Sequence, residues 1–266
     1  MEWRDLEMAP TETVRSDFRQ LILDNEDQVV KAYGPMKSRY TKMLNRIKQI
    51  LYTWLTEYGI TDMVTAQMYW DRFESELRSE LSTEIELRFE DAKDILYKIF
   101  TTTYLWTLDY EDWEQDSEDE SNLTPAIFLV LLGTAWSADE LTYQERLNSN
   151  MEKAITQVRR IIMREIGIGS SSNKIWQSIY QELNKIKYRG STQITDEAQH
   201  LSNEAVRMAS TNRSNGYFIN EILDNRICEF CKAMDGKYFK WDDYYAGITA
   251  PQFHPRCRGI IIPDSR

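Results

Sequence analysis

The sequence has few of the residues that interrupt helices, and it lacks a segment that could cross a membrane. Only 10 glycines and 6 prolines occur in 266 residues, which argues against many short strands and favours long helices. The longest apolar run, residues 126–136, is too short for a bilayer, which a helix crosses in about 20 residues. Residues 1–5 lack the basic and apolar segments of a secretory signal. We therefore expect a soluble chain, kept in the cytoplasm, with no membrane contact.

Positive charge is also in short supply. The chain has 32 Lys and Arg against 43 Asp and Glu, a formal net charge of −11. A protein that binds nucleic acid regardless of sequence needs a basic surface, which this chain as a whole lacks. The acidic excess is concentrated in residues 109–121, which contain no basic residue. Because clustered like charges repel one another, we predict an exposed loop there.

Helical periodicity dominates the chain up to about residue 224. The spacing predicts helices over about residues 14–33, 35–57, 61–106, 123–136, 137–165, 170–186 and 195–208. Gly34 and Pro35 separate the first two, and Ser137–Glu140 has the pattern of a capping box. The helix over 123–136 is expected to be buried, and the one over 61–106 has room for a break.

The composition changes after Gly216. The final 51 residues hold 3 of the 6 prolines and 4 of the 10 glycines. Residues 237–241 and 259–262 are rich in aromatic or β-branched side chains, and we predict short strands there. The chain is thus divided into residues 1–139, a helical region containing the acidic loop, residues 140–215, also helical, and residues 216–266, a small module.

All three cysteines lie in that module, in two short motifs. Cys228-x2-Cys231 is followed by His254-x2-Cys257. Three thiolates and one imidazole at this spacing match a tetrahedral zinc site with four protein ligands. A closed site of this kind has no position for water, so it would stabilise the module and catalyse nothing. The expected fold class is therefore mainly α: an elongated helical region with a small α+β C-terminal module stapled by zinc.

Other interpretations of these residues remain open at this stage. The cysteines can be reduced and partly buried beside an unrelated histidine, and two of them can form a disulfide. A catalytic pair of Cys228 or Cys257 with His254 as base is a third possibility, but no glycine-rich oxyanion element accompanies it. Residues 167–170 lack the lysine of a phosphate loop, so we interpret them as a helix end. His200 stands alone on a helix and is expected at a surface or interface.

The module also resembles a known family. Residues 225–239, NRICEFCKAMDGKYF, resemble the D-x-R-x-C-x-x-C-x-x-x-D-G-K-x-[YF] block of the phage Mu F-like head-morphogenesis, or minor capsid, family. Residues 250–263, APQFHPRCRGIIIP, resemble that family's P-x-x-H-P-x-C-R-C-x-x-x-P ending. Gly259 stands in place of the last cysteine, which leaves four candidate ligands rather than five. The resemblance covers residues 140–266 in outline and does not extend to residues 1–139.

The resemblance implies a component of a tailed-phage or prophage head. Such proteins accompany the portal protein, are present in few copies, and act in head assembly or DNA passage. We therefore expect a protein that is not an enzyme, located in the virion near the portal and in the host cytoplasm during assembly. Its expected partners are the portal protein, the major capsid protein or both, and in addition packaged DNA. Some relatives carry toxin domains after this module; because the chain ends shortly after the motif, we expect none here.

An alternative function is a nucleic-acid-binding protein built on the zinc module. Four basic residues could form a local basic face: Lys237, Lys240, Arg256 and Arg258. The module itself has a neutral charge balance, which argues against this alternative.

Overall fold

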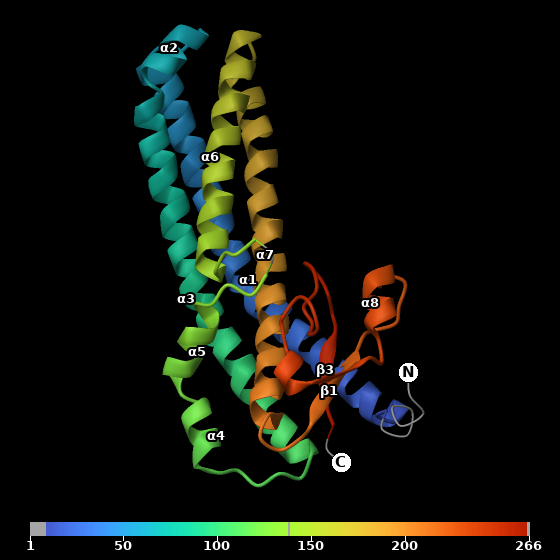
Figure 1. The fold of residues 1–266 in the computed structure, drawn as a ribbon. Helices are drawn as coiled ribbons and strands as arrows, with labels where there is room; N and C mark the ends of the chain where they lie inside the picture. The colour runs from blue at the N-terminus through green and yellow to red at the C-terminus, as the bar shows by residue number, and fades with distance from the viewer. Residues whose placement is uncertain (1–8, 138, 265–266) are drawn as a thin grey trace. The chain divides into compact units, whose positions relative to one another are not determined.

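The computed structural model describes residues 9–137 and 139–264. Ala138, within the predicted capping box, and residues 1–5 lie outside the described residues. The chain is mainly helical, with a small sheet formed by its last quarter (Figure 1). The elements are α1 Glu12–Glu57, α2 Met63–Met68, α3 Trp70–Tyr110, α4 Ser117–Asn122, α5 Pro125–Leu132, α6 Tyr143–Gly167, α7 Ser172–Ser210, β1 Gly216–Asn220, α8 Glu229–Met234, β2 Tyr238–Lys240, the 3-10 turn Trp241–Asp243 and β3 Ile260–Pro263. Within the described residues, no helix combines the length and apolar character needed to span a membrane.

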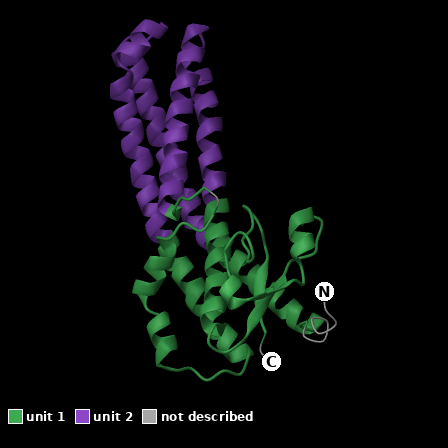
Figure 2. Ribbon diagram, viewed as in Figure 1, with its two compact units in different colours: residues 1–31, 92–143, 192–266 green, residues 32–91, 144–191 purple. Residues whose placement is uncertain are grey.

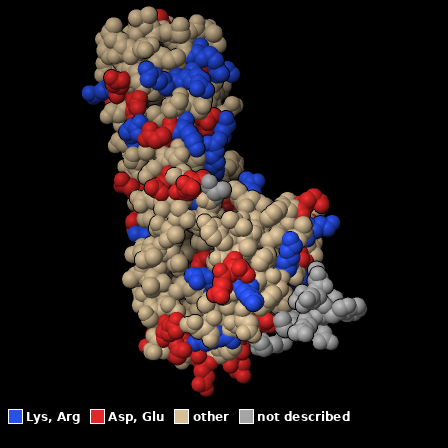
Figure 3. Space-filling view, viewed as in Figure 1, with Lys and Arg blue, Asp and Glu red and all other residues tan. Residues whose placement is uncertain are grey.

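The chain forms two compact units, and neither is continuous in sequence (Figure 2). The sheet unit comprises residues 1–31, 92–143 and 192–266, and the helical unit comprises residues 32–91 and 144–191. Helices α1, α3 and α7 contribute residues to both. The helical unit has 17 Lys and Arg against 14 Asp and Glu, a net charge of +3, whereas the sheet unit has 15 against 29, a net charge of −14. Figure 3 shows acidic side chains gathered at the end of the sheet unit that carries α4.

The first helix continues through the predicted break. A proline in a helix interior costs about 3 kcal/mol, yet Pro35 lies inside α1. Met36 and Tyr40 directly after it are buried, and the Tyr40 hydroxyl donates a hydrogen bond to the Leu183 carbonyl. Packing within the helical unit therefore outweighs the cost of the proline, and the prediction of two separate helices was wrong.

Two other predicted helices also differ from the structure. The break expected between 186 and 195 is absent, because α7 is continuous and Ile186 and Ile194 on either side of the expected gap are both buried. The helix expected over 123–136 is the shorter α5. It buries Phe128 but leaves Val130 65% exposed, so it is buried on one face only. The predicted break in the third helix is confirmed, since α2 ends at Met68 and α3 begins at Trp70.

The acidic stretch is largely exposed, as predicted, but only residues 111–116 of it lie outside helices. Helix α3 runs into it, α4 lies within it, and Asp119 of α4 is completely buried. Asp119 accepts hydrogen bonds from the Tyr104 hydroxyl at 2.6 Å and from Arg213 Nη2 at 2.8 Å. Arg213 also pairs with Asp116 at 3.0 Å. Arg213, which follows α7, thus offsets the repulsion between Asp116 and Asp119.

The sheet has the order β2-β1-β3, with both pairs antiparallel. β2 and β3 confirm the two predicted strands, and β1 was not predicted. All five residues of β1 are buried, so the strand is covered on both faces and does not show the alternation that a half-exposed strand would. Its core includes side chains from β1, β3, the start of α1 and the end of α7: Phe18, Ile22, Val206, Tyr217, Ile219, Ile260, Ile261 and Ile262.

The buried charge of Asp119 predicts a pH-dependent stability. Burial raises the pKa of Asp119, but hydrogen bonds from Tyr104, the Asp116 amide and Arg213 outweigh it and leave the pKa lowered. Its contribution is therefore complete above the unfolded pKa of about 3.9 and is lost as the pH falls through the lower folded value. We expect Asp119→Asn to reduce the free energy of unfolding at pH 7 by about 1.5–3 kcal/mol.

The measurement is urea unfolding of both chains at pH 7 and near pH 3. The difference between wild type and Asp119→Asn should shrink at the lower pH. The exposed Glu114 offers a matched control, and Glu114→Gln should change little at either pH. A difference that stays constant with pH would contradict the role given to the charge.

Candidate metal centre

The first pair of predicted ligands is placed by the short helix α8. Cys228 is the N-cap residue of α8, and its Sγ accepts the Cys231 backbone N–H at 3.4 Å. Cys231 lies one turn further on and is 2% exposed. A cysteine at the N-cap and another at the third helical position point to the same side, because that separation is close to one helical turn. The CxxC spacing thus brings both sulfurs together locally.

The second pair lies in the loop before β3. The Cys257 backbone N–H donates to the His254 carbonyl at 3.0 Å, which closes a tight turn. The His254 Nδ1 lies 2.8 Å from the Pro255 carbonyl oxygen. A carbonyl only accepts, so Nδ1 carries the proton and Nε2 is the nitrogen available to a metal. This is the arrangement that orients histidine ligands in metal sites.

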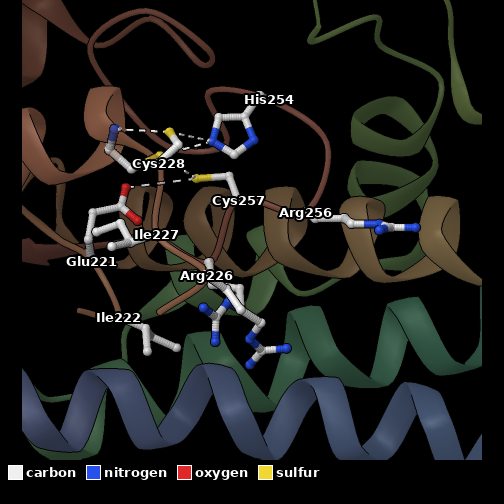
Figure 4. A pocket seen from close by; sticks show the side chains of 10 residues that line it. Glu221, Ile222, Arg226, Ile227, Cys228, His254, Arg256 and Cys257 are labelled. Atoms are coloured by element: carbon white, nitrogen blue, oxygen red, sulfur yellow. Dashed lines mark hydrogen bonds between the residues drawn. The ribbon is translucent and has the colours of Figure 1, made fainter. Parts of the chain in front are cut away.

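The fold brings all four predicted ligands into one pocket (Figure 4). The His254 Nε2 lies 3.2 Å from Cys228 Sγ and 3.1 Å from Cys231 Sγ, and Cys231 Sγ lies 3.8 Å from Cys257 Sγ. With Zn–S bonds of about 2.3 Å, the edge between two sulfurs of a tetrahedron is about 3.8 Å. The separations among Cys228, Cys231 and His254 therefore fit one metal ion, and Cys257 lies at the matching distance from Cys231. The three cysteines are free thiols, with no disulfide among them.

The thiols differ in their affinity for the proton. A hydrogen bond from Cys231 lowers the pKa of Cys257 to about 6, although burial acts in the opposite direction. The same bond, with burial and the nearby Cys257, raises the pKa of Cys231. The Cys231 amide lowers the pKa of Cys228. One thiolate is therefore favoured near neutral pH, and an incoming divalent ion would displace the remaining protons.

Glu221 belongs to the same pocket and was not singled out in the sequence. Its Oε1 lies 3.8 Å from Cys257 Sγ, and the residue is 2% exposed. Burial, with Cys257 and Asp235 nearby, raises its pKa to about 9. The donor atoms form two groups, and within each group they lie within 4.8 Å of one another. The first group is Cys228, Cys231 and His254, and the second is Glu221, Cys231 and Cys257. Glu221 follows β1, a strand that the sequence analysis missed, so no local motif pointed to it.

Buried polar side chains of α7 hold the loop that carries His254 and Cys257. Asp196 Oδ1 accepts the Arg256 backbone N–H at 2.7 Å and the Gln252 side-chain amide at 2.6 Å. Gln199 and Asn203 donate to the Gly259 carbonyl at 2.8 and 3.1 Å. Because these groups are buried, each bond is costly to break, and the second pair of ligands is held in place before any metal binds.

The start of α1 holds the segment that carries Glu221 and α8. Arg15 Nη2 donates to both carboxylate oxygens of Asp235, at 2.5 and 2.6 Å. Asp235 in turn accepts the Glu221 backbone N–H at 2.8 Å. The Arg19 Nε donates to the Glu221 carbonyl at 2.9 Å. Two arginines one helical turn apart thus fix both ends of the peptide at Glu221.

The structure gives the four basic residues of the alternative function separate environments. Arg258 is 9% exposed and pairs with Asp224 at 2.6 Å. Arg256 points away from the sulfurs in Figure 4, and its Nη2 lies 3.4 Å from Thr192 Oγ1. Lys237 contacts Met234 Sδ at 3.5 Å, and Lys240 is exposed at the end of β2. Their role in nucleic-acid binding stays a prediction.

Two further expectations have clear outcomes. His200 is 4% exposed and stacks on Trp136 with 4.8 Å between ring centroids, so the surface position expected for it was wrong. The residues around His200 in the sequence do not indicate that the Trp136 ring covers it. The helix end over 167–170 is confirmed: α6 ends at Gly167, and Gly169 has the positive φ of +72° that glycine tolerates.

The Arg15–Asp235 ion pair predicts a measurable coupling. Asp235→Asn keeps an acceptor for the Glu221 amide but removes the charge that binds Arg15. We expect the free energy of unfolding to fall by about 1.5–3 kcal/mol. Amide hydrogen exchange should accelerate in the first turns of α1. Asp242→Asn is a matched control at an exposed position, and it should leave both quantities unchanged. Equal effects of the two substitutions would contradict the assigned contact.

Comparison with known proteins connects this segment to a family. The family model described as Phage Mu protein F like protein matches residues 156–262. Comparisons with curated proteins and with solved structures give no significant match. The matched residues include α7, the sheet down to Ile262, and both Cys-containing motifs. This segment, which contains all four predicted metal ligands, is therefore similar to phage Mu F-like proteins.

Proposed function

We propose that this protein is a minor capsid, or head-morphogenesis, protein of a tailed phage or prophage. The observation that carries the proposal is the family match over residues 156–262. We place the protein at the portal vertex of the head, with the portal protein, the major capsid protein or both as partners. In this role it acts in head assembly or DNA passage and catalyses no reaction.

The Cys/His cluster supports a structural rather than a catalytic role. The ligands Cys228, Cys231, His254 and Cys257 are the thiolate and imidazole donors that zinc prefers in structural sites. A bound Zn²⁺ would supply a crosslink between α8 and the loop before β3. Asp196 of α7 already holds the loop before β3 in place. The metal site would therefore make the module rigid, as a part of a large assembly requires.

The helical unit provides apolar surface for contact with other head proteins. Several large apolar side chains at α2 and the α6–α7 connection are exposed: Met63 at 53%, Val64 at 73%, Met68 at 69% and Ile168 at 72%. Apolar side chains grouped on an exposed surface are typical of protein–protein contacts. Flexible methionines, moreover, adapt to partners of different shape. We propose that this end of the helical unit binds the portal protein.

The first prediction from this proposal concerns copy number. Quantitative mass spectrometry of purified particles should find this chain at a few to a few tens of copies per head, measured against the major capsid protein. Presence in procapsids and absence from mature particles would make it an assembly factor within the same proposal. Absence from both kinds of particle would overturn the proposal.

The second prediction concerns the metal. The purified chain should contain about one zinc ion per molecule, and Cys228→Ser should lose most of it, because metal binding free energy is folding free energy in such modules. Loss of the crosslink should lower the melting temperature by about 6–12 °C, which corresponds to about 3 kcal/mol for a chain of this size.

Lys232, an exposed residue of the same helix α8, gives a matched control. Lys232→Ser should retain both the zinc and the melting temperature of wild type. If Cys228→Ser melts like wild type and keeps its zinc, the ligand assignment is wrong.

A further inference from the structure

Glu221 directs a buried carboxylate at the metal ligands. Its Oε1 faces Cys257 Sγ at 3.8 Å, and Figure 4 shows the carboxylate turned toward that sulfur. The four-residue ligand set assigns it no role. It nevertheless forms a compact donor group with Cys231 and Cys257, and it shares Cys231 with the group that contains His254.

The backbone on both sides of the Glu221 side chain is held by hydrogen bonds. The Glu221 N–H donates to Asp235 and its carbonyl accepts from Arg19, at 2.8 and 2.9 Å. Both partners lie on elements packed against the sheet, so the peptide is fixed on either side of the side chain. A carboxylate whose backbone is held in this way is preorganised rather than placed by chance.

Gly259 provides the space that the carboxylate occupies. A Cβ at position 259 would lie 2.3 Å from Glu221 Oε1, 2.8 Å from its Cδ and 2.9 Å from Pro251 Cγ, all inside van der Waals contact. The backbone at 259 cannot retreat easily, because its carbonyl accepts hydrogen bonds from Gln199 and Asn203. A side chain at 259 and the carboxylate of Glu221 therefore exclude each other. Because position 259 has no side chain, the Glu221 carboxyl group, directly after β1, can lie beside the cluster.

The charges in the pocket indicate a role for the Glu221 carboxylate in binding a cation. A carboxyl group this deeply buried is costly to ionise unless a cation compensates its charge. No Lys or Arg side chain forms an ion pair with Glu221 among the described salt bridges. A divalent metal ion between the two donor groups would provide the missing positive charge, and zinc accepts carboxylate oxygens at about 2.0–2.2 Å.

We propose that Glu221 is a metal ligand and that its carboxylate occupies space that a side chain at position 259 would fill. The donor set is then Glu221, Cys228, Cys231, His254 and Cys257, with Cys231 common to both groups. The inference rests on the metal-binding role proposed above and adds to it an oxygen donor from the residue that follows β1.

X-ray absorption of the zinc-loaded full chain tests the donor set directly. We expect three sulfur scatterers near 2.3 Å and two nitrogen or oxygen scatterers at about 2.0–2.2 Å. Glu221→Gln and Glu221→Ala should each lose one of the light scatterers. Both should also weaken zinc binding by about 10-fold or more in competition with a chelator.

The glutamine variant separates a ligand from a residue that merely positions Cys257. Its amide keeps the shape and a hydrogen bond to the sulfur, but it is a poor ligand. Wild-type affinity and an unchanged spectrum in Glu221→Gln would overturn the proposal. A wild-type spectrum with a single light scatterer would also overturn it, without reference to any variant.

A substitution at Gly259 tests the exclusion of the two side chains. Gly259→Cys alone should weaken zinc binding, because the new side chain overlaps Glu221. In the Glu221→Ala background, the same change should weaken zinc binding less, because only the overlap with Pro251 Cγ remains. Equal effects of Gly259→Cys with and without Glu221 would contradict the geometry.

The outcomes also separate this inference from the metal site itself. If wild type binds no zinc, the proposed metal-binding role fails and Glu221 with it. If Cys257→Ser loses zinc while both Glu221 variants retain wild-type affinity and scatterers, the four-residue site stands and only the Glu221 ligand is excluded.

Discussion

The small sheet and its pocket depend on a row of buried polar side chains along α7. Asp196, Gln199 and Asn203 lie at intervals of three and four residues, so they share one face of the helix. They bind the loop before β3 and the start of β3 itself, where Asn203 Oδ1 accepts the Ile261 amide at 2.9 Å. These side chains satisfy backbone groups that burial would otherwise leave unpaired. The same bonds place His254 and Cys257 opposite α8.

The start of α1 completes this arrangement from another side. Arg15 and Arg19 hold the peptide after β1, while Phe18 and Ile22 enter the core beneath the sheet. Polar and apolar contacts from two neighbouring faces of one helix thus serve the same segment. The metal cluster is consequently tied to parts of the chain about 200 residues away in sequence, for example by the contact between Arg19 and Glu221, with a separation of 202. Binding or loss of a metal ion would therefore change the stability of α1 as well as that of the module.

The charge distribution follows the division into units. The sheet unit has most of the acidic excess, and part of it is buried and offset by Arg213 rather than left in solvent. The helical unit is slightly basic. The two units therefore differ in the sign of their net charge. This is consistent with the proposed role and does not require the nucleic-acid-binding alternative.

Much of the local structure could be predicted from the sequence because its causes are local. The CxxC and HxxC spacings bring pairs of donors together within one turn, and the helical periodicity revealed most of the long helices. The scarcity of glycine and proline pointed to a mainly helical chain. At Gly34 and Pro35, helix-breaking residues interrupt a helical periodicity, and the helix break expected there is absent. Contacts with distant helices bury Met36 and Tyr40 and so keep α1 continuous.

The remaining features were set by contacts between distant parts of the chain. β1 is a buried strand without alternation, and its register comes from β2 and β3 rather than from its own residues. Asp119 is buried because Arg213 reaches it, and Glu221 meets Cys257 because Gly259 leaves space. Spacing along the chain reveals donors that are neighbours in sequence. A donor that arrives from another strand has no such spacing, so folding alone brings it to the site.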